Sequence, residues 1–393
     1  MVVRNQVIFL PLFALVLIGG SCRNNPVIIE PIKECEYPPG NRTFSWQVDT
    51  VGWFPSSIGG VWAFADDDAY LMGSIIQYDD QNNPEGYLGL HWNGERWGPD
   101  INGTVEEIRH VSNDVTGDSS YMVSVGNWSI TPPKPALGEF DNTTKQWTGY
   151  QFETEGELRA VWTDGNGYVI AVGDNGMVYT KNSYQTPWVY SKAPTDFNLT
   201  HVDGVSDSEI YIQGFISLPG EPIYEQVWKF TGSEWYKLYD NQDTTGVPLY
   251  LENAMSPFNG GVSDVASYRC SDTDSLQLYI IGNESFLVTA AGQSLSYEVL
   301  NLSDRGLPLR QNQRTGLRVD FFTPNDVWIY GTRYNFYHWD GTGFAKMEIP
   351  GLPNDDSQFG FQKDMMKTPS GKVFLPTEVA SQVYVVVQGT PKN

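Results

Sequence analysis

The sequence is poor in cysteine, in basic residues and in long stretches free of glycine and proline. Three of its 393 residues are Cys, so at most one intramolecular disulfide is available. Lys and Arg number 24 against 47 Asp and Glu, and the resulting net charge of −23 argues against a nucleic-acid partner. Gly (39) and Pro (24) disfavour helical bundles, coiled coils and membrane-spanning helices after the first 21 residues. Short strands with frequent turns fit this composition best.

The N-terminus has the features of an export signal. Arg4 precedes an apolar run from Val7 to Ile18, and small residues follow before Cys22. This pattern predicts a secretory signal peptide over residues 1–21. The small residues before Cys22 resemble a bacterial lipoprotein cleavage site, which implies that Cys22 carries the lipid, although Gly19 departs from that pattern. Simple secretion is the alternative, and residues 22–42 are expected to form a Pro-containing tether.

Two further features bear on the compartment. Cys35 and Cys270 either pair in an oxidising compartment or remain two isolated thiols. Seven N-x-S/T sequons, such as those at Asn142 and Asn198, suit a glycosylated eukaryotic secreted protein. The Cys-ended signal favours a bacterial envelope instead.

A repeat of about 51 residues runs through the rest of the chain. Its first strand pair begins with Val and ends with Gly twelve residues later in Val61–Gly73, Val161–Gly173, Val202–Gly214 and Val319–Gly331. Weaker copies begin at Val111, Val265 and Met365. Each reads as an apolar strand, a polar turn and a second strand, which we name strands a and b.

A second hairpin follows in most copies. Two aromatic residues flank Asn-Gly, Thr-Gly or Asp-Gly in His91–Trp97, Trp228–Trp235 and His338–Phe344, which predicts strands c and d. Four strands per repeat predict an all-β, seven-bladed β-propeller over residues 43–393. The last repeat is one strand short, so we expect the alternating segment Thr43–Val51 to complete it and close the ring.

The sequence resembles secreted bacterial propellers of the BNR-like and photosystem-assembly-factor-like groups. The residues that carry the resemblance are Asp326, Val327, Trp328, His338 to Gly341 and the hairpin Val172–Trp188. The strict Asp-box of sialidases is absent, and WD-repeat and kelch patterns fit less well. The resemblance implies the fold and carries no function with it.

Candidate binding residues lie on the face that carries the d–a and b–c connections, which hold most of the long insertions. Arg109, Arg159 and Arg318 lie at or just before strand a, so they are expected near the central channel, with Arg333 in the same basic stretch. An aromatic patch is expected from Tyr78, Trp128 and Tyr224. The competing interpretation is that the arginines pair with the abundant acids and that the loops merely connect strands.

The sequence carries no recognised catalytic or metal-binding motif. It lacks G-x-S-x-G, a phosphate-binding glycine loop and a spaced calcium loop, and Asp66 to Asp68 fit a repeated turn role. The four His lie at repeat positions rather than at zinc spacing, so we expect them to pack or donate hydrogen bonds. No cofactor is expected.

These features predict a monomeric, non-catalytic binding or scaffolding propeller at a bacterial envelope. Its partner is a protein or a glycan, and it contacts the membrane only through the N-terminal lipid. A glycan-cleaving, sialidase-like propeller and a purely structural envelope protein are the alternatives.

Overall fold

The computed structural model describes residues 40–99, 110–128, 131–221, 223–242, 262–269, 275–282, 285–291, 298–302, 307, 318–330, 336–352, 364–379 and 383–392. The predicted signal peptide, Cys22, Cys35, Cys270, Arg109 and Arg333 lie outside these residues. Within the described part, no helix has the length and apolar character that crossing a bilayer requires.

The described strands form one seven-stranded sheet and five four-stranded sheets, all antiparallel between neighbours. The seven-stranded sheet runs in the order β25 (Met366–Lys367), β26 (Val373–Val379), β27 (Val383–Pro391), β1 (Phe44–Ala65), β2 (Asp68–Tyr78), β3 (Pro84–Trp92) and β4 (Trp97–Gly98). The first two four-stranded sheets contain β5 (Val111–Gly117), β6 (Tyr121–Trp128), β7 (Lys134–Asp141) and β8 (Gln146–Gln151), then β9 (Leu158–Thr163), β10 (Val169–Gly173), β11 (Met177–Lys181) and β12 (Val189–Lys192). A short 3₁₀ turn, η2 (Asp174–Gly176), joins β10 to β11.

The remaining three sheets follow in chain order. They contain β13 (Asn198–Ser206), β14 (Glu209–Ser217), β15 (Ile223–Phe230) and β16 (Trp235–Asp240); β17 (Val262–Tyr268), β18 (Ser275–Gly282), β19 (Phe286–Ala291) and β20 (Glu298–Asn301); and β21 (Arg318–Thr323), β22 (Asp326–Tyr330), β23 (Phe336–Trp339) and β24 (Phe344–Met347). The prediction of four-stranded antiparallel blades is confirmed, and the count of seven blades stays a prediction.

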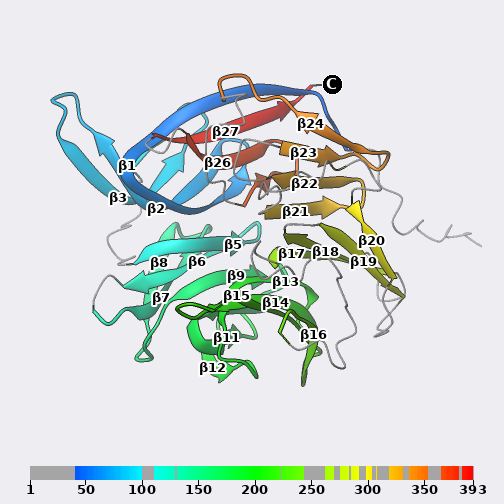
Figure 1. Ribbon diagram of the computed structural model, residues 1–393. Helices are drawn as coiled ribbons and strands as arrows, with labels where there is room; N and C mark the ends of the chain where they lie inside the picture. The colour runs from blue at the N-terminus through cyan, green and yellow to red at the C-terminus, as the bar shows by residue number, and fades with distance from the viewer. Residues whose placement is uncertain are drawn as a thin grey trace, which may run out of the picture. The chain divides into compact units, whose positions relative to one another are not determined.

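The long strand β1 belongs to two blades. Its first half, Phe44–Trp53, pairs with β27, whereas Ser57–Ala65 pairs with β2 (Figure 1). The N-terminal segment therefore completes the C-terminal blade, as the strand count predicted. Just before β1, the Gly40 N–H donates to the carbonyl oxygen of Asn325 at 2.9 Å, so the end of the predicted tether contacts the β21–β24 blade.

The first strand of each blade contacts the first strand of the next. These contacts run from β1 to β5, β9, β13, β17 and β21, and β25 contacts β1 again. The Met365 N–H donates to Asp320 at 2.8 Å and connects β21 to the residue before β25. These inner strands surround the central channel, where the candidate site lies.

Apolar residues fill the space between neighbouring blades. One core cluster combines Val123 and Leu137 with Val161 and Val169 from the next blade, and all four side chains are buried. The predicted c–d hairpins form as well, with Trp92 opposite Trp97 and similar aromatic pairs in the β13–β16 and β21–β24 blades. Burial of this apolar surface is the main force that holds the blades together.

Ion pairs reinforce three of these blade interfaces. An acid at the start of strand b is bonded to a residue on strand c and to a cation from the following blade. The three sets are Asp68, His91 and Lys145; Glu209, Lys229 and Arg269; and Asp326, His338 and Lys367. The expected packing and hydrogen-bonding role of the His residues is thus seen at His91 and His338.

Candidate functional site

The central cavity is formed by short segments of the inner strands. Its volume is about 240 Å³, and each inner strand contributes neighbouring residues around one central apolar position. The central residues are Val61, Val115, Val161, Val202, Val265, Val319 and Met365. The second repeat was predicted to start at Val111, but Val115 occupies this position in β5.

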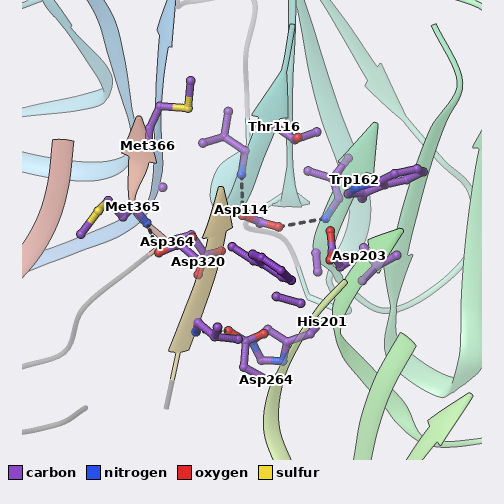
Figure 2. Close-up of a pocket in the computed structure, with 18 of the residues that line it drawn as sticks. Asp114, Thr116, Trp162, His201, Asp203, Asp264, Asp320, Asp364, Met365 and Met366 are labelled. Atoms are coloured by element: carbon purple, nitrogen blue, oxygen red, sulfur yellow. Dashed lines mark hydrogen bonds and ion pairs between the residues drawn. The ribbon is translucent and has the colours of Figure 1, made fainter. Parts of the chain in front are cut away.

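The residues just before the central position carry most of the charge around the cavity. Four of the seven residues at this position are charged, namely Asp114, Asp264, Asp364 and, in β21, Arg318. The other three are Gly60, Ala160 and His201. Figure 2 shows Asp114, Asp203, Asp264, Asp320 and Asp364 gathered around this space with His201. The lining is therefore strongly acidic, with Arg318 and His201 beside it.

Four of these carboxylates, of which Asp264 is buried and the others are half-buried, accept hydrogen bonds from backbone N–H groups of the following blade. Asp114 accepts from Val161 N–H at 2.9 Å, and Asp264 accepts from Val319 N–H at 2.9 Å. Asp203 accepts from the Ser267 hydroxyl at 2.9 Å and from its N–H, and Asp320 accepts from Met365 N–H. Each carboxylate thus ties one inner strand to the next.

Burial raises the pKa of these carboxyl groups. Desolvation, with a contribution from Asp364, raises the pKa of Asp114 to about 7. Desolvation raises the pKa of Asp203 to about 6, and it holds the pKa values of Asp264 and Asp320 well above the usual range. The cavity therefore gains negative charge as the pH rises through neutrality.

Arg318 partly offsets this negative charge. Burial opposes its charged form, but Asp364 and Asp264 outweigh that effect and raise the pKa of the guanidinium. Arg318 lies 3.3 Å from Asp364 and also contacts His201. Among the described residues, no group of three or more His, Cys, Asp or Glu side chains is arranged to hold a metal ion.

The predicted arginines have different positions. Neither Arg318 nor Arg159 is among the residues that line the cavity: Arg318 pairs with the lining residue Asp364 at 3.3 Å, whereas Arg159 pairs with Asp174 at 2.6 Å. Arg109 and Arg333 lie outside the described residues. Sequence reasoning missed the channel aspartates, although Asp114, Asp264 and Asp364 share one position in the repeat.

The predicted aromatic residues lie on three different sheets. Tyr78 ends β2 and is 42% exposed, Trp128 ends β6, and Tyr224 lies on β15 with its hydroxyl directed to Glu221 at 3.3 Å. Tyr78 instead meets Trp53, with ring centroids 5.7 Å apart and planes at 71°. The side chain of Phe54, which directly follows Trp53 in the chain, is 64% exposed.

These exposed residues lie on the face predicted to bind. Trp53 and Phe54 lie where β1 passes from one blade to the next, which is a d–a connection, and Tyr78 lies on a b–c connection. Leu218 and Ile223, which are also exposed, flank the b–c connection between β14 and β15. Trp53 and Tyr78 are in ring contact beside Phe54, and a contiguous group of exposed aromatic side chains is typical of an interaction surface, whereas Leu218 and Ile223 lie at a different sheet.

Comparisons with known proteins support the fold. No family model and no curated protein matches the sequence. Among solved structures, YCF48 bound to D1 peptide is 13% identical with a TM-score of 0.57, and the match covers 90% of this chain and 98% of that one. YCF48 from Cyanidioschyzon merolae is 15% identical with a TM-score of 0.54, and the match covers 89% of this chain and all of that one. The chain therefore has the β-propeller fold, similar to that of YCF48.

Proposed function

We propose that this protein is an exported, lipid-anchored, monomeric β-propeller that binds a protein partner at a bacterial envelope and has no catalytic activity. The observation that carries the proposal is the set of exposed apolar side chains on the d–a and b–c face, namely Trp53, Phe54, Tyr78, Leu218 and Ile223. Aromatic residues on a rigid surface contribute strongly to protein recognition.

The channel chemistry supports a non-catalytic role. A general acid or base must reach the reacting group of a substrate. The carboxylates of Asp114, Asp264 and Asp320 instead accept backbone hydrogen bonds from the next blade. YCF48, which has a similar fold, is bound to the D1 peptide in its solved structure, and this is consistent with a protein partner for the present chain.

Affinity capture with matched variants tests the binding face. Residues 23–393 are immobilised and exposed to envelope extract, with Phe54→Ala/Tyr78→Ala as the test variant. The control is Val189→Ala/Tyr190→Ala, which removes comparably exposed side chains from the outer strand β12. We expect a captured protein that is lost with the test variant and retained with the control.

Equal capture by all three preparations would remove this face from the proposal. A glycan array probed with the same preparations covers the glycan alternative. Face-dependent glycan binding without a protein partner would assign the surface to a glycan instead.

The proposed anchor is tested in a bacterial host with the full-length chain. Wild type should incorporate a labelled fatty acid and fractionate with membranes, whereas Cys22→Ser should do neither. Incorporation of the labelled fatty acid by Cys22→Ser would show that the lipid is attached at another residue.

A further inference from the structure

A second cavity lies between the β9–β12 and β13–β16 blades. Its volume is about 490 Å³. It is bordered by a–b turn residues Asp207 and Ser208 and by c–d turn residues Asn182 and Gly232. These turns are at the opposite ends of the strands from the d–a and b–c connections, so the cavity is separate from the proposed protein-binding face. Figure 1 labels the strands β11, β12, β14, β15 and β16 of these two blades.

The lining combines aromatic rings with an acid and small polar groups. Tyr168, Phe230 and Trp235 provide the rings, and the last two lie 4.9 Å apart between centroids. Thr180, Asn182, Ser191 and Ser208 provide oxygen atoms, and Asp207 is an exposed carboxylate. The lining includes no Lys, Arg or His, and across the described residues Asp207 forms no ion pair.

The local field is negative. Burial and the nearby carboxylates of Asp207 and Asp164 raise the pKa of Tyr168 to about 12. The phenol therefore stays neutral at physiological pH, and a positive group in the cavity would meet no competing charge from its lining.

Three other blades carry an aromatic residue on strand b at the position that borders this cavity. These residues are Tyr70, Tyr211 and Trp328, and each lies opposite the residue that follows the central apolar position of strand a. Each also faces a His or Lys on strand c: Tyr70 stacks on His91, Trp328 stacks on His338, and Lys229 lies over Tyr211. In each of these interfaces a cation of the next blade forms an ion pair with the acid at the start of strand b. The cations are Lys145, Arg269 and Lys367.

The β9–β12 blade has smaller residues at the same positions. Ile170 lies opposite Trp162 and faces Thr180, where the other three blades carry an aromatic ring and a His or Lys. Tyr168 replaces the acid at the start of strand b, and the next blade presents Gly232 in its c–d turn. The cavity therefore lies where the other three interfaces contain an aromatic ring and a cation, and where this interface contains neither at the equivalent strand positions.

We propose that this cavity binds the side chain of an arginine from a basic peptide. The guanidinium plane stacks against Trp235 or Tyr168 and donates hydrogen bonds to the Asp207 carboxylate. Thr180, Asn182 and Ser191 accept its remaining N–H groups. The ligand thus supplies the cation that Lys145, Arg269 and Lys367 supply elsewhere, and the net charge of −23 favours a basic partner.

Two small probes test the site without knowledge of the partner. Protein with ¹⁵N-labelled tryptophan indoles is titrated with N-acetyl-arginine amide and, in parallel, with the neutral isostere N-acetyl-citrulline amide, and the indole resonances are followed by NMR. The Trp235 resonance is assigned by its loss in Trp235→Phe. We expect a saturable shift with the arginine probe and about tenfold weaker binding of the citrulline probe, because citrulline lacks the charge.

Matched variants locate the binding. Asp207→Asn should weaken arginine binding about tenfold, and Thr180→Lys should abolish it by placing a cation where Lys229 lies in the next blade. Asp67→Asn removes an exposed carboxylate from the same type of turn in the β1–β4 blade and should have no effect. Circular dichroism confirms that each variant is folded.

The proposal is overturned by the absence of a saturable Trp235 shift, by equal binding of the two probes, or by unchanged binding in Asp207→Asn or Thr180→Lys. Because the site lies away from the d–a and b–c face, these results are independent of the Phe54→Ala/Tyr78→Ala experiment. Either proposal can therefore fail while the other stands.

Discussion

The Asp264 carboxylate on β17 accepts a hydrogen bond from the backbone N–H of Val319 on β21, across 2.9 Å. Its other oxygen accepts the N–H of its own neighbour, Val265, at 2.8 Å. Asp114 makes the same pair of bonds, to Val161 and Val115. This repeated contact joins blades at the channel and underlies the first two predictions.

Loss of the Asp264 side chain should weaken the contact between two blades. Asp264→Ala leaves the buried Val319 N–H without its acceptor, so we expect the free energy of unfolding to fall by about 1–3 kcal/mol. Asp264→Asn keeps an acceptor oxygen and should cost less. Urea unfolding measures both, with Asp196→Ala as an exposed control. An equal loss for the Ala and control variants would show that the contact contributes nothing.

The stability of the protein should depend on pH through Asp114. Desolvation raises its folded-state pKa to about 7, above the unfolded value of about 3.9. The folded state then binds the proton more tightly, so this stabilising contribution is complete below about pH 3.9 and is lost as the pH rises through about 7. A tenfold difference in proton affinity between the folded and unfolded states corresponds to about 1.4 kcal/mol.

The variant Asp114→Asn removes this titration. Urea unfolding between pH 5 and pH 8 should show a steeper fall of the unfolding free energy in wild type than in the variant. Identical slopes would show that Asp114 has the same proton affinity in both states.

A buried ion pair links the β5–β8 and β9–β12 blades. Lys181 and Glu139 are 2% and 3% exposed and lie 2.5 Å apart between the ammonium nitrogen and a carboxylate oxygen. Lys181→Met leaves an uncompensated buried carboxylate and should lower the free energy of unfolding by about 3–5 kcal/mol.

The matched experiment uses the double variant Lys181→Met/Glu139→Gln, which removes both charges and should recover part of this loss in urea unfolding. Lys192→Met, which breaks the exposed pair with Asp196, should cost about 0–1 kcal/mol. Similar losses for Lys181→Met and Lys192→Met would contradict the prediction.

Gly173, the glycine that ends strand b in the β9–β12 blade, allows two backbone segments to approach closely. A Cβ there would lie 2.0 Å from the carbonyl oxygen of Glu157, which belongs to the backbone leading into β9. Gly173→Ala should therefore force these strands apart at a cost of about 1–3 kcal/mol. Gly98→Ala, where a Cβ meets nothing within 4 Å, is the control for thermal unfolding. Equal melting temperatures for the two variants would exclude this explanation.

Much of the architecture follows from local sequence patterns. The alternating strands around Val161–Gly173 and the Asn-Gly turn between Trp92 and Trp97 are decided within a few residues, because strand and turn propensities act locally. The strand missing from the last repeat predicted that Thr43–Val51 would complete it, and Phe44–Trp53 does pair with β27. That inference came from counting strands, because the two paired segments lie at opposite ends of the chain. The repeat position shared by Asp114, Asp264 and Asp364 was also present in the sequence and was not recognised.

The side-chain partners could not be predicted in this way. Arg159 and Arg318 have similar positions in the repeat, yet one binds Asp174 and the other lies by Asp364. The partner of each depends on which side chains the strands bring together in space. Sequence alone places these arginines near strand a but does not choose between pairing and an open channel.

The sequence by itself determined the β-propeller fold, the antiparallel four-stranded blades and the closure by an N-terminal strand. Tertiary structure alone decided which backbone groups the channel aspartates bind, the exposed pair of Trp53 and Tyr78, and the cavity beside Trp235. The physical reason is that most strands of a blade are close in sequence and their patterns act locally, and the closing strand follows from the strand count, whereas these sites form where side chains from separate strands or blades meet. Asp114 and Val161, for example, become neighbours only when two blades pack.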